Sequence, residues 1–121
     1  VDDVVIVHAS GGEVAVIPPN YGHVTVNPST REPLVMANLV SSAFSSEYSE
    51  YRQLRGAAYY ELSDGTIVPN PNYEALPPVR LVPATSWSPP NIYDAFIESP
   101  SSFEFLNKPR MYHWAKPWVK P

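Results

Sequence analysis

The sequence predicts an all-β fold of short antiparallel strands, with one short helix and a proline-rich C-terminal arm. Short segments rich in β-branched residues alternate with turn residues, one stretch has helical spacing, and proline is distributed unevenly. Residues 1–68 contain 4 of the 15 prolines, and residues 69–121 contain the other 11. Because each proline removes a backbone donor from a β-ladder, we expect regular sheet in residues 1–68 and an irregular extension that packs on it in residues 69–121.

The predicted strands are bounded by turn residues, as in the Ser-Asp-Gly turn at residues 63–65. Residues 23–27 alternate strictly, which places His23, Thr25 and Asn27 on one face of a strand and two valines on the other. Several short strands separated by turns indicate a sandwich or a barrel. The expected strands are residues 4–8, 13–17, 23–27, 34–40, 57–62 and 66–68.

One helix interrupts the strand pattern, because the large apolar side chains of residues 44–54 recur at helical spacing. Ser45 or Ser46 can cap its start by accepting a backbone N–H, and Gly56 can end it. We therefore expect a short helix near residues 45–55.

The proline-rich arm contains two further helical candidates, residues 91–98 and the weaker segment 101–106. Residues 114–121 are basic, aromatic and rich in proline, and we expect them to lie across a surface. The arm has too many aromatic side chains to leave in water, so we expect it to pack on the sheet or on a neighbouring subunit. These side chains are Tyr93, Phe96, Phe103, Phe105, Tyr112, Trp114 and Trp118.

Composition excludes several classes of protein. The chain of 121 residues has a net charge of -4, and its 8 basic residues are scattered, which argues against nucleic acid or an anionic membrane as partner. Cysteine is absent, so disulfides and thiolate chemistry are excluded. The start of the chain lacks the basic and apolar regions of a signal peptide, and we expect it to lie inside a domain of a cytoplasmic protein. No nucleotide-binding glycine motif and no serine-hydrolase motif is present.

His23 is the strongest candidate for a metal ligand. It follows a Pro-Pro-x-x-Gly turn at the start of a predicted strand, and imidazole is the commonest protein ligand for metal ions. A histidine hydrogen-bonded at a strand end is the alternative, because a metal centre needs three or four ligands and no two histidines have ligand spacing. The other histidines are His8 and His113, and Glu13 and Glu32 are turn carboxylates that we expect to be solvated.

Hydroxyl groups in and after the predicted helix can line a sugar site, and the alternative is amphipathic packing at the edge of the sheet. They belong to Tyr48, Tyr51, Tyr59 and Tyr60. Arg52 and Arg55 can clamp a phosphate group, or they can complement the negative end of the helix dipole.

Residues 12–27 form the most distinctive motif of the chain: a glycine, an apolar strand, Pro-Pro, an aromatic-bearing turn and then His-x-Thr-x-Asn. Residues 32–35 continue it as Glu-Pro-Leu-Val. The motif resembles the second cupin motif of the archaeal-type glucose-6-phosphate isomerases. Residues 92–96 and 103–109 are similar to the C-terminal extension of longer members of that family.

The resemblance implies a cupin, or jelly-roll-like, antiparallel barrel whose second half is residues 1–68. The family binds a divalent metal, typically iron. Its first motif provides a His-x-His pair and a glutamate as ligands, and its second motif provides one histidine. Only the last ligand maps onto this chain, at His23, and we expect the first motif to precede Val1. The general base also maps to that missing part, so the catalytic residues are unknown.

The family reaction is the interconversion of glucose 6-phosphate and fructose 6-phosphate, an aldose–ketose isomerisation of glycolysis and gluconeogenesis. The candidate substrate-binding residues are Tyr21, Thr25 and Tyr48. The chain departs from the pattern of some family members in two places. Asn20 stands where they have an aromatic residue in the turn. Near Val40 and Ser46 they carry a tyrosine and a histidine, which this chain lacks.

Three interpretations follow from these observations. The first is a metal-dependent isomerase represented by its second half. The alternatives are a cupin-derived binding or structural module without catalysis, and one chain of a split enzyme. Because exposed strand edges are a liability, we expect a homodimer or a complementing chain as partner, beside the sugar-phosphate substrate.

Overall fold

The structure is a computed structural model that describes residues 1–86 and 91–112. By contact, the chain forms two compact units, each assembled from three segments. The first unit contains residues 1–4, 22–36 and 45–80, and the second contains residues 5–21, 37–44 and the chain from residue 81 onward. The predicted division of the chain after residue 68 stays a prediction.

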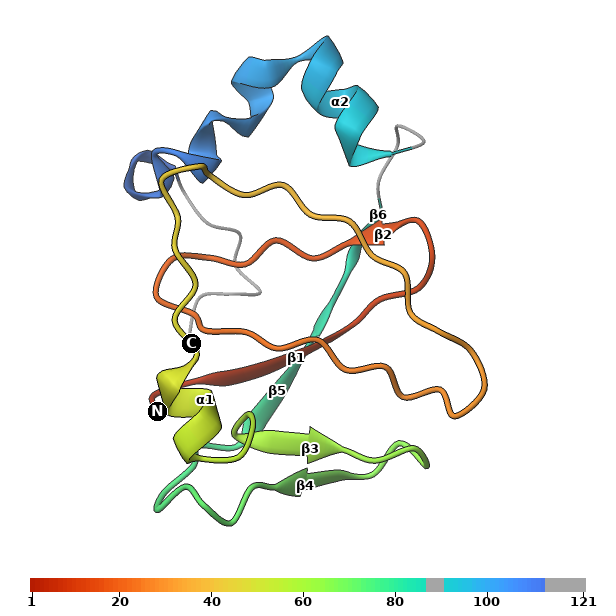
Figure 1. Cartoon of the computed structure of the whole chain (residues 1–121), viewed down its shortest axis with the longest axis vertical. Coiled ribbons are helices and arrows are strands. Elements are labelled where there is room, and N and C mark those ends of the chain that lie inside the picture. The colour runs from red at the N-terminus through yellow and green to blue at the C-terminus, as the bar shows by residue number, and fades with distance from the viewer. Residues whose placement is uncertain (87–90, 113–121) are drawn as a thin grey trace. The chain divides into compact units, whose positions relative to one another are not determined.

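The described residues form three two-stranded sheets and no closed barrel (Figure 1). Strand β1 pairs with β5, β2 with β6, and β3 with β4. The prediction of a strand-rich fold is thereby confirmed, whereas the cupin barrel stays a prediction. The strands are β1 (Val4–His8), β2 (Glu13–Val14), β3 (Tyr59–Glu61), β4 (Ile67–Pro69), β5 (Val79–Pro83) and β6 (Thr85–Ser86).

Two predicted strands, residues 23–27 and 34–40, are absent from the described part of the chain. Their apolar side chains are exposed: Val24 is 45% exposed and Val35 is 90% exposed. A β pattern describes a segment that suits a sheet, but a strand exists only where another segment satisfies its backbone groups. These segments have the pattern and lack the partner. For the same reason β2 is shorter than the predicted strand 13–17.

Strand β5 lies in the proline-rich arm, where we expected no regular sheet. Its prolines explain the difference, because Pro78 precedes the strand and Pro83 ends it, so the interior residues keep their ladder donors. Arg80 of β5 donates from Nε and Nη2 to the two carboxylate oxygens of Asp3, at 2.9 and 2.6 Å. This bidentate ion pair joins the start of β5 to the residue before β1.

The β3–β4 hairpin confirms the predicted turn at residues 63–65. The strands are antiparallel, with Tyr60 opposite Val68. Gly65 has a φ of 85° and donates its N–H to the Leu62 carbonyl at 2.9 Å. Glycine adopts this positive φ without a steric penalty, so the local sequence sets the place of the turn.

Helix α1 (Ser49–Gln53) confirms the predicted helix but is shorter. The prediction that Ser45 or Ser46 caps it is wrong, because the Glu47 carboxylate accepts the Ser49 N–H at 2.7 Å. This hydrogen bond lowers the pKa of Glu47. The carboxylate also suits the positive end of the helix dipole.

The C-terminal end of α1 is a Schellman motif. The Gly56 N–H donates to the Tyr51 carbonyl at 2.8 Å, and the Arg55 N–H donates to the Arg52 carbonyl at 3.4 Å. The left-handed position of this motif is normally glycine, yet here Arg55 occupies it with a φ of 56°. Gly56, which we expected to end the helix, is the next residue along.

In the second unit, helix α2 (Ile92–Glu98) confirms the helical candidate at residues 91–98. The Asn91 side chain accepts the Asp94 N–H at 2.8 Å and donates to the Asp94 carboxylate at 2.7 Å. Two 3₁₀ helices follow, η1 (Pro100–Leu106) and η2 (Pro109–Met111). The weaker helical candidate at residues 101–106 is therefore a tighter helix than expected.

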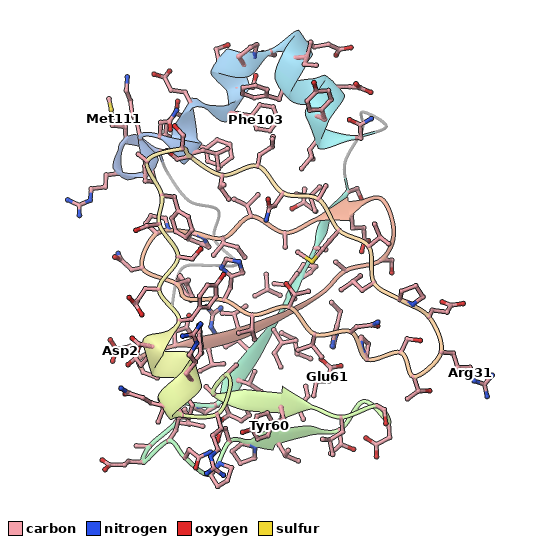
Figure 2. All side chains as sticks on the ribbon, viewed as in Figure 1. Asp2, Arg31, Tyr60, Glu61, Phe103 and Met111 are labelled. Carbon is pink, nitrogen blue, oxygen red and sulfur yellow. The ribbon has the colours of Figure 1, made fainter. Side chains whose placement is uncertain are left out.

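Four aromatic side chains of the arm contact one another in a chain that includes Phe103, which Figure 2 labels. Phe96 meets Phe103 edge to face with centroids 5.8 Å apart, and Phe103 stacks on Phe105 at 6.4 Å. Phe105 meets Tyr112 edge to face at 6.0 Å. The arm therefore has an aromatic cluster of its own. The predictions that concern Trp114, Trp118 and the tail lie outside the described residues.

Few apolar side chains are buried in the described residues. They are Pro18, Ala58, Val82 and Ala95. The most deeply buried large side chain there is polar, since Asn70 is 1% exposed. No helix in residues 1–86 or 91–112 has the length and apolar character required to cross a membrane.

Candidate functional site around His23

His23 lies in an extended segment of the first unit, directly after Gly22, and its side chain is exposed. Thr25 is exposed in the same segment. Because residues 23–27 form no strand, the alternation that would place these two side chains on one face of a sheet is not realised as a ladder. Both residues remain candidates by the motif that they belong to.

The other two candidate substrate residues come from different places. Tyr48 is the N-cap residue of α1 and is 53% exposed. Tyr21 is half-buried and belongs by contact to the second unit. Their roles in binding substrate stay predictions.

Asn27 ends the His-x-Thr-x-Asn motif and organises the turn that follows. Its side-chain amide donates to the Glu32 carbonyl at 2.8 Å, and its side-chain oxygen accepts the Ser29 N–H at 3.0 Å. The Ser29 hydroxyl oxygen in turn accepts the N–H groups of Arg31 and Glu32, at 3.2 and 2.9 Å. Asn27 therefore closes a loop whose tip carries Arg31 (Figure 2). The sequence placed Asn27 on the face of His23, whereas its side chain is engaged with its own turn.

Tyr51 of α1 lies against the backbone immediately before His23. A Cβ atom built on Gly22 would lie 2.5 Å from the Tyr51 hydroxyl oxygen and 3.3 Å from its Cζ. Burial, and then the proximity of Tyr73 and Glu50, raise the pKa of Tyr51. The hydroxyl is therefore neutral near pH 7. The sequence suggested Tyr51 only as a general sugar-site or packing residue and did not connect it to Gly22.

A network of side-chain donors satisfies the carbonyl groups just after α1. Asn70 donates its side-chain amide to the carbonyls of Leu54 and Ala57, each at 2.9 Å. Asn72 adds a second donor to the Leu54 carbonyl at 3.1 Å. The Tyr73 hydroxyl donates to the Gly56 carbonyl at 3.1 Å.

The same network includes β3. The hydroxyl of Tyr60, which Figure 2 labels on that strand, donates to the Arg55 carbonyl at 3.0 Å. Four consecutive carbonyls after the helix thus receive side-chain donors, which holds α1 and the β3–β4 hairpin together. Sequence reasoning missed this network. Its available signal was the Pro-Asn-Pro-Asn run at residues 69–72, in which asparagines favour turns held by side-chain hydrogen bonds.

The described residues do not complete a metal site. They contain no group of three or more histidine, aspartate or glutamate side chains arranged to hold an ion. The assignment of His23 as a metal ligand stays a prediction. The Glu13 carboxylate accepts the Ser10 N–H at 2.7 Å, which fits a turn role. His8 ends β1, and His113 lies outside the described residues.

Arg52, in α1, and Arg55, just after it, both lie at the C-terminal end of the helix. Arg52 lies in the last turn of the helix, where its charge complements the dipole, and Arg55 forms the left-handed residue of the Schellman motif. Their role as a phosphate clamp stays a prediction.

Comparison with known proteins identifies the family. Residues 1–77, well over half of the chain, match the family model described as Glucose-6-phosphate isomerase (GPI). Neither the curated proteins nor the solved structures contain a significant match to the chain. The matched residues include the motif around His23, helix α1 and the β3–β4 hairpin, all of which precede the aromatic cluster of the arm. By this match, and as the resemblance of residues 12–27 indicated, the chain belongs to the glucose-6-phosphate isomerase family.

Proposed function

We propose that the protein is a cupin-type isomerase that interconverts glucose 6-phosphate and fructose 6-phosphate, and that this chain contributes His23 to its site. The observation that carries the proposal is the family match over residues 1–77, which contains the His-x-Thr-x-Asn motif. The reaction would belong to glycolysis and gluconeogenesis in the cytoplasm.

The chemistry of this reaction is a redistribution of protons. A base removes the proton from carbon 2 and returns it to carbon 1, while a second proton moves between the two oxygens, so no electron acceptor is needed. A divalent metal, which we propose to be iron, would supply polarisation of the sugar oxygens when bound. The described residues offer it His23 alone.

In this proposal the hydroxyl groups of Tyr21, Thr25 and Tyr48 bind the sugar. A hydroxyl can both donate and accept, which suits the alternating requirements of sugar hydroxyl groups. The general base and the remaining metal ligands would both come from the first motif of the family, which does not map onto this chain.

We further propose that a homodimer or a complementing chain completes the barrel, as in a split enzyme. Two features support this proposal: the described residues lack three clustered ligands, and segments 23–27 and 34–40 expose strand-like sequences without a sheet partner. A second chain that pairs with these segments would satisfy their backbone groups. A non-catalytic cupin-derived module remains the alternative.

The decisive experiment compares His23→Ala with His8→Ala. In the complete assembly, we expect His23→Ala to abolish most isomerase activity and to lower the bound metal content, because a site that loses a ligand binds its ion less tightly. His8→Ala should change neither quantity. Coupled assay of fructose 6-phosphate formation, with elemental analysis of the same samples, measures both.

The isolated 121-residue chain provides the second arm of the test. Because it offers only one of the expected ligands, we expect weak binding of divalent metal and little or no turnover of glucose 6-phosphate. Robust turnover by the pure chain would show that the site lies elsewhere. Unchanged activity and metal content in His23→Ala would remove His23 from it, and a complete assembly without isomerase activity would favour the non-catalytic module.

A further inference from the structure

A side chain at position 22 would require Tyr51 to move, because of a tertiary contact. A Cβ atom there would approach the Tyr51 hydroxyl oxygen to 2.5 Å, which is closer than Cβ atoms come to nonbonded heavy atoms in proteins. Gly22 is not among the glycines with a positive φ, so its backbone conformation alone is open to other residues. Gly12 and Gly65 show the opposite case, because they have a positive φ and open space around the Cβ position.

Tyr51 is itself held in place. Its carbonyl accepts the Gly56 N–H at 2.8 Å in the Schellman motif, and its side chain is partly buried. The carbonyls that follow are bound by Asn70, Tyr60 and Tyr73. The ring therefore projects from a well-supported helix end onto the turn that contains Gly22.

His23 has no comparable support from a sheet. Residues 23–27 form no ladder in the described part of the chain, and the imidazole is exposed. The contact between Tyr51 and Gly22 therefore constrains the backbone one residue before His23. In the predicted strand, a β-ladder would have provided this constraint instead. Packing of an aromatic ring against an α-carbon restricts both the position and the direction of the next residue.

We infer that Tyr51 is a positioning residue for His23: by packing on Gly22, it fixes the backbone from which the imidazole is presented to the site. The inference rests on the proposed function for the importance of His23, but the contact can be tested independently. It also explains why a bulky tyrosine faces a glycine at the head of the motif.

A double-mutant cycle tests the inference on the full chain. Gly22→Ala places a methyl group against the hydroxyl, whereas Tyr51→Phe removes the oxygen and leaves the ring carbon at 3.3 Å as the nearest atom. We expect Gly22→Ala to lower the NMR order parameter of the His23 amide in this chain, and to weaken Co²⁺ binding about tenfold in the complete assembly, at the lower end for loss of an outer-shell partner. Adding Tyr51→Phe to Gly22→Ala should restore most of both. Gly11→Ala is the matched control, because its Cβ position is in open space.

The outcomes separate the contact from the function. An unchanged His23 amide in Gly22→Ala, or equal losses with and without Tyr51→Phe, would overturn the positioning role. If Gly22→Ala does not fold, Tyr51→Leu replaces it as the test variant, because leucine is a good helix former and lacks the ring. The His23 amide must then lose order while the His8 amide does not. Co²⁺ binding that is unchanged by His23→Ala would instead reject the proposed site and leave the Tyr51–Gly22 coupling measurable.

Discussion

At the scale of single residues, Asn70 shows how one polar side chain can organise an irregular region. It is 1% exposed, its amide group donates to two carbonyls, and its side-chain oxygen accepts the N–H of Asn72 at 3.0 Å and its side-chain amide at 2.9 Å. Its own N–H donates to the Ala58 carbonyl at 2.8 Å. Every hydrogen-bonding group of the side chain is therefore used, which is the condition under which a buried amide stabilises a fold.

Replacing Asn70 with leucine should destabilise the chain by about 3 kcal/mol, since it leaves the Ala57 carbonyl and the Asn72 N–H without these partners and puts a larger apolar side chain in a fully buried position. Asn72→Ala is the control, because Asn72 is more exposed and the Leu54 carbonyl keeps its bond from Asn70. Urea unfolding of both variants measures the difference. Equal midpoints for the two would show that the network does not stabilise the structure.

Asn70→Asp makes the same site sensitive to pH. The new carboxyl group would face the carbonyl oxygens of Leu54 and Ala57, so burial and these oxygens disfavour its charged form and raise its pKa in the folded state. The folded state then binds more protons than the unfolded state between the two pKa values, so stability falls as pH rises through that interval. Thermal melts across the acidic range should show the variant losing stability as pH rises, relative to the parent. A parallel pH profile would contradict this reasoning.

At the scale of elements, a residue with a side chain adopts a left-handed backbone conformation just after α1. Arg55 has a φ of 56°, a left-handed conformation in which its Cβ lies too close to the following carbonyl. Its backbone is retained there by the Schellman bonds and by the Tyr60 hydroxyl on its carbonyl. The element therefore accepts a local steric cost in order to turn the chain into β3.

Arg55→Gly should stabilise the chain by roughly 0.5–1 kcal/mol, because glycine adopts the left-handed conformation without that cost. Arg52→Gly is the matched control within the helix, where glycine should be destabilising by about 1 kcal/mol. Thermal unfolding of the two variants should therefore move in opposite directions. A drop in stability for Arg55→Gly would instead indicate that its side chain has a role of its own.

At the scale of the whole molecule, the arm contributes partners to the second unit. Strand β6 pairs with β2, with Glu13 opposite Ser86. The Ser41 hydroxyl donates to the Asn107 side-chain oxygen at 2.5 Å, which joins the residue after η1 to residues 37–44. With so few buried apolar residues in the described part, each of these connections matters to a marginally stable fold.

Truncation after Val82 should lower the melting temperature markedly. It removes β6, so that β2 loses its ladder, and it removes the aromatic cluster that begins at Phe96 and buries apolar surface worth roughly 25 cal/mol per Å². Ser41→Ala is the control, since it removes two exposed hydrogen bonds, to the Asn107 side chain and from the Ala43 N–H, and should cost less than about 2 kcal/mol. Identical melting of the truncated and full chains would mean that the arm is a loose tail.

The sequence alone specified the features of this protein that depend on short-range signals, such as turns and helix caps. The bounds of β1, the hairpin turn at residues 63–65 and the helix after Asn91 were predictable, because turns and caps act over three or four residues. The motif at residues 12–27 likewise indicated the family from its residues alone. The physical reason is that these signals are complete within a short segment.

Only the tertiary structure decided which segments pair. Strand β5 pairs with β1 from the proline-rich half of the chain, whereas residues 23–27 carry a clear strand pattern and form no strand in the described part. Asn70 and the contact of Tyr51 on Gly22 likewise depend on neighbours distant in sequence. Pairing and packing are properties of two segments at once, so no pattern in either segment alone specifies them.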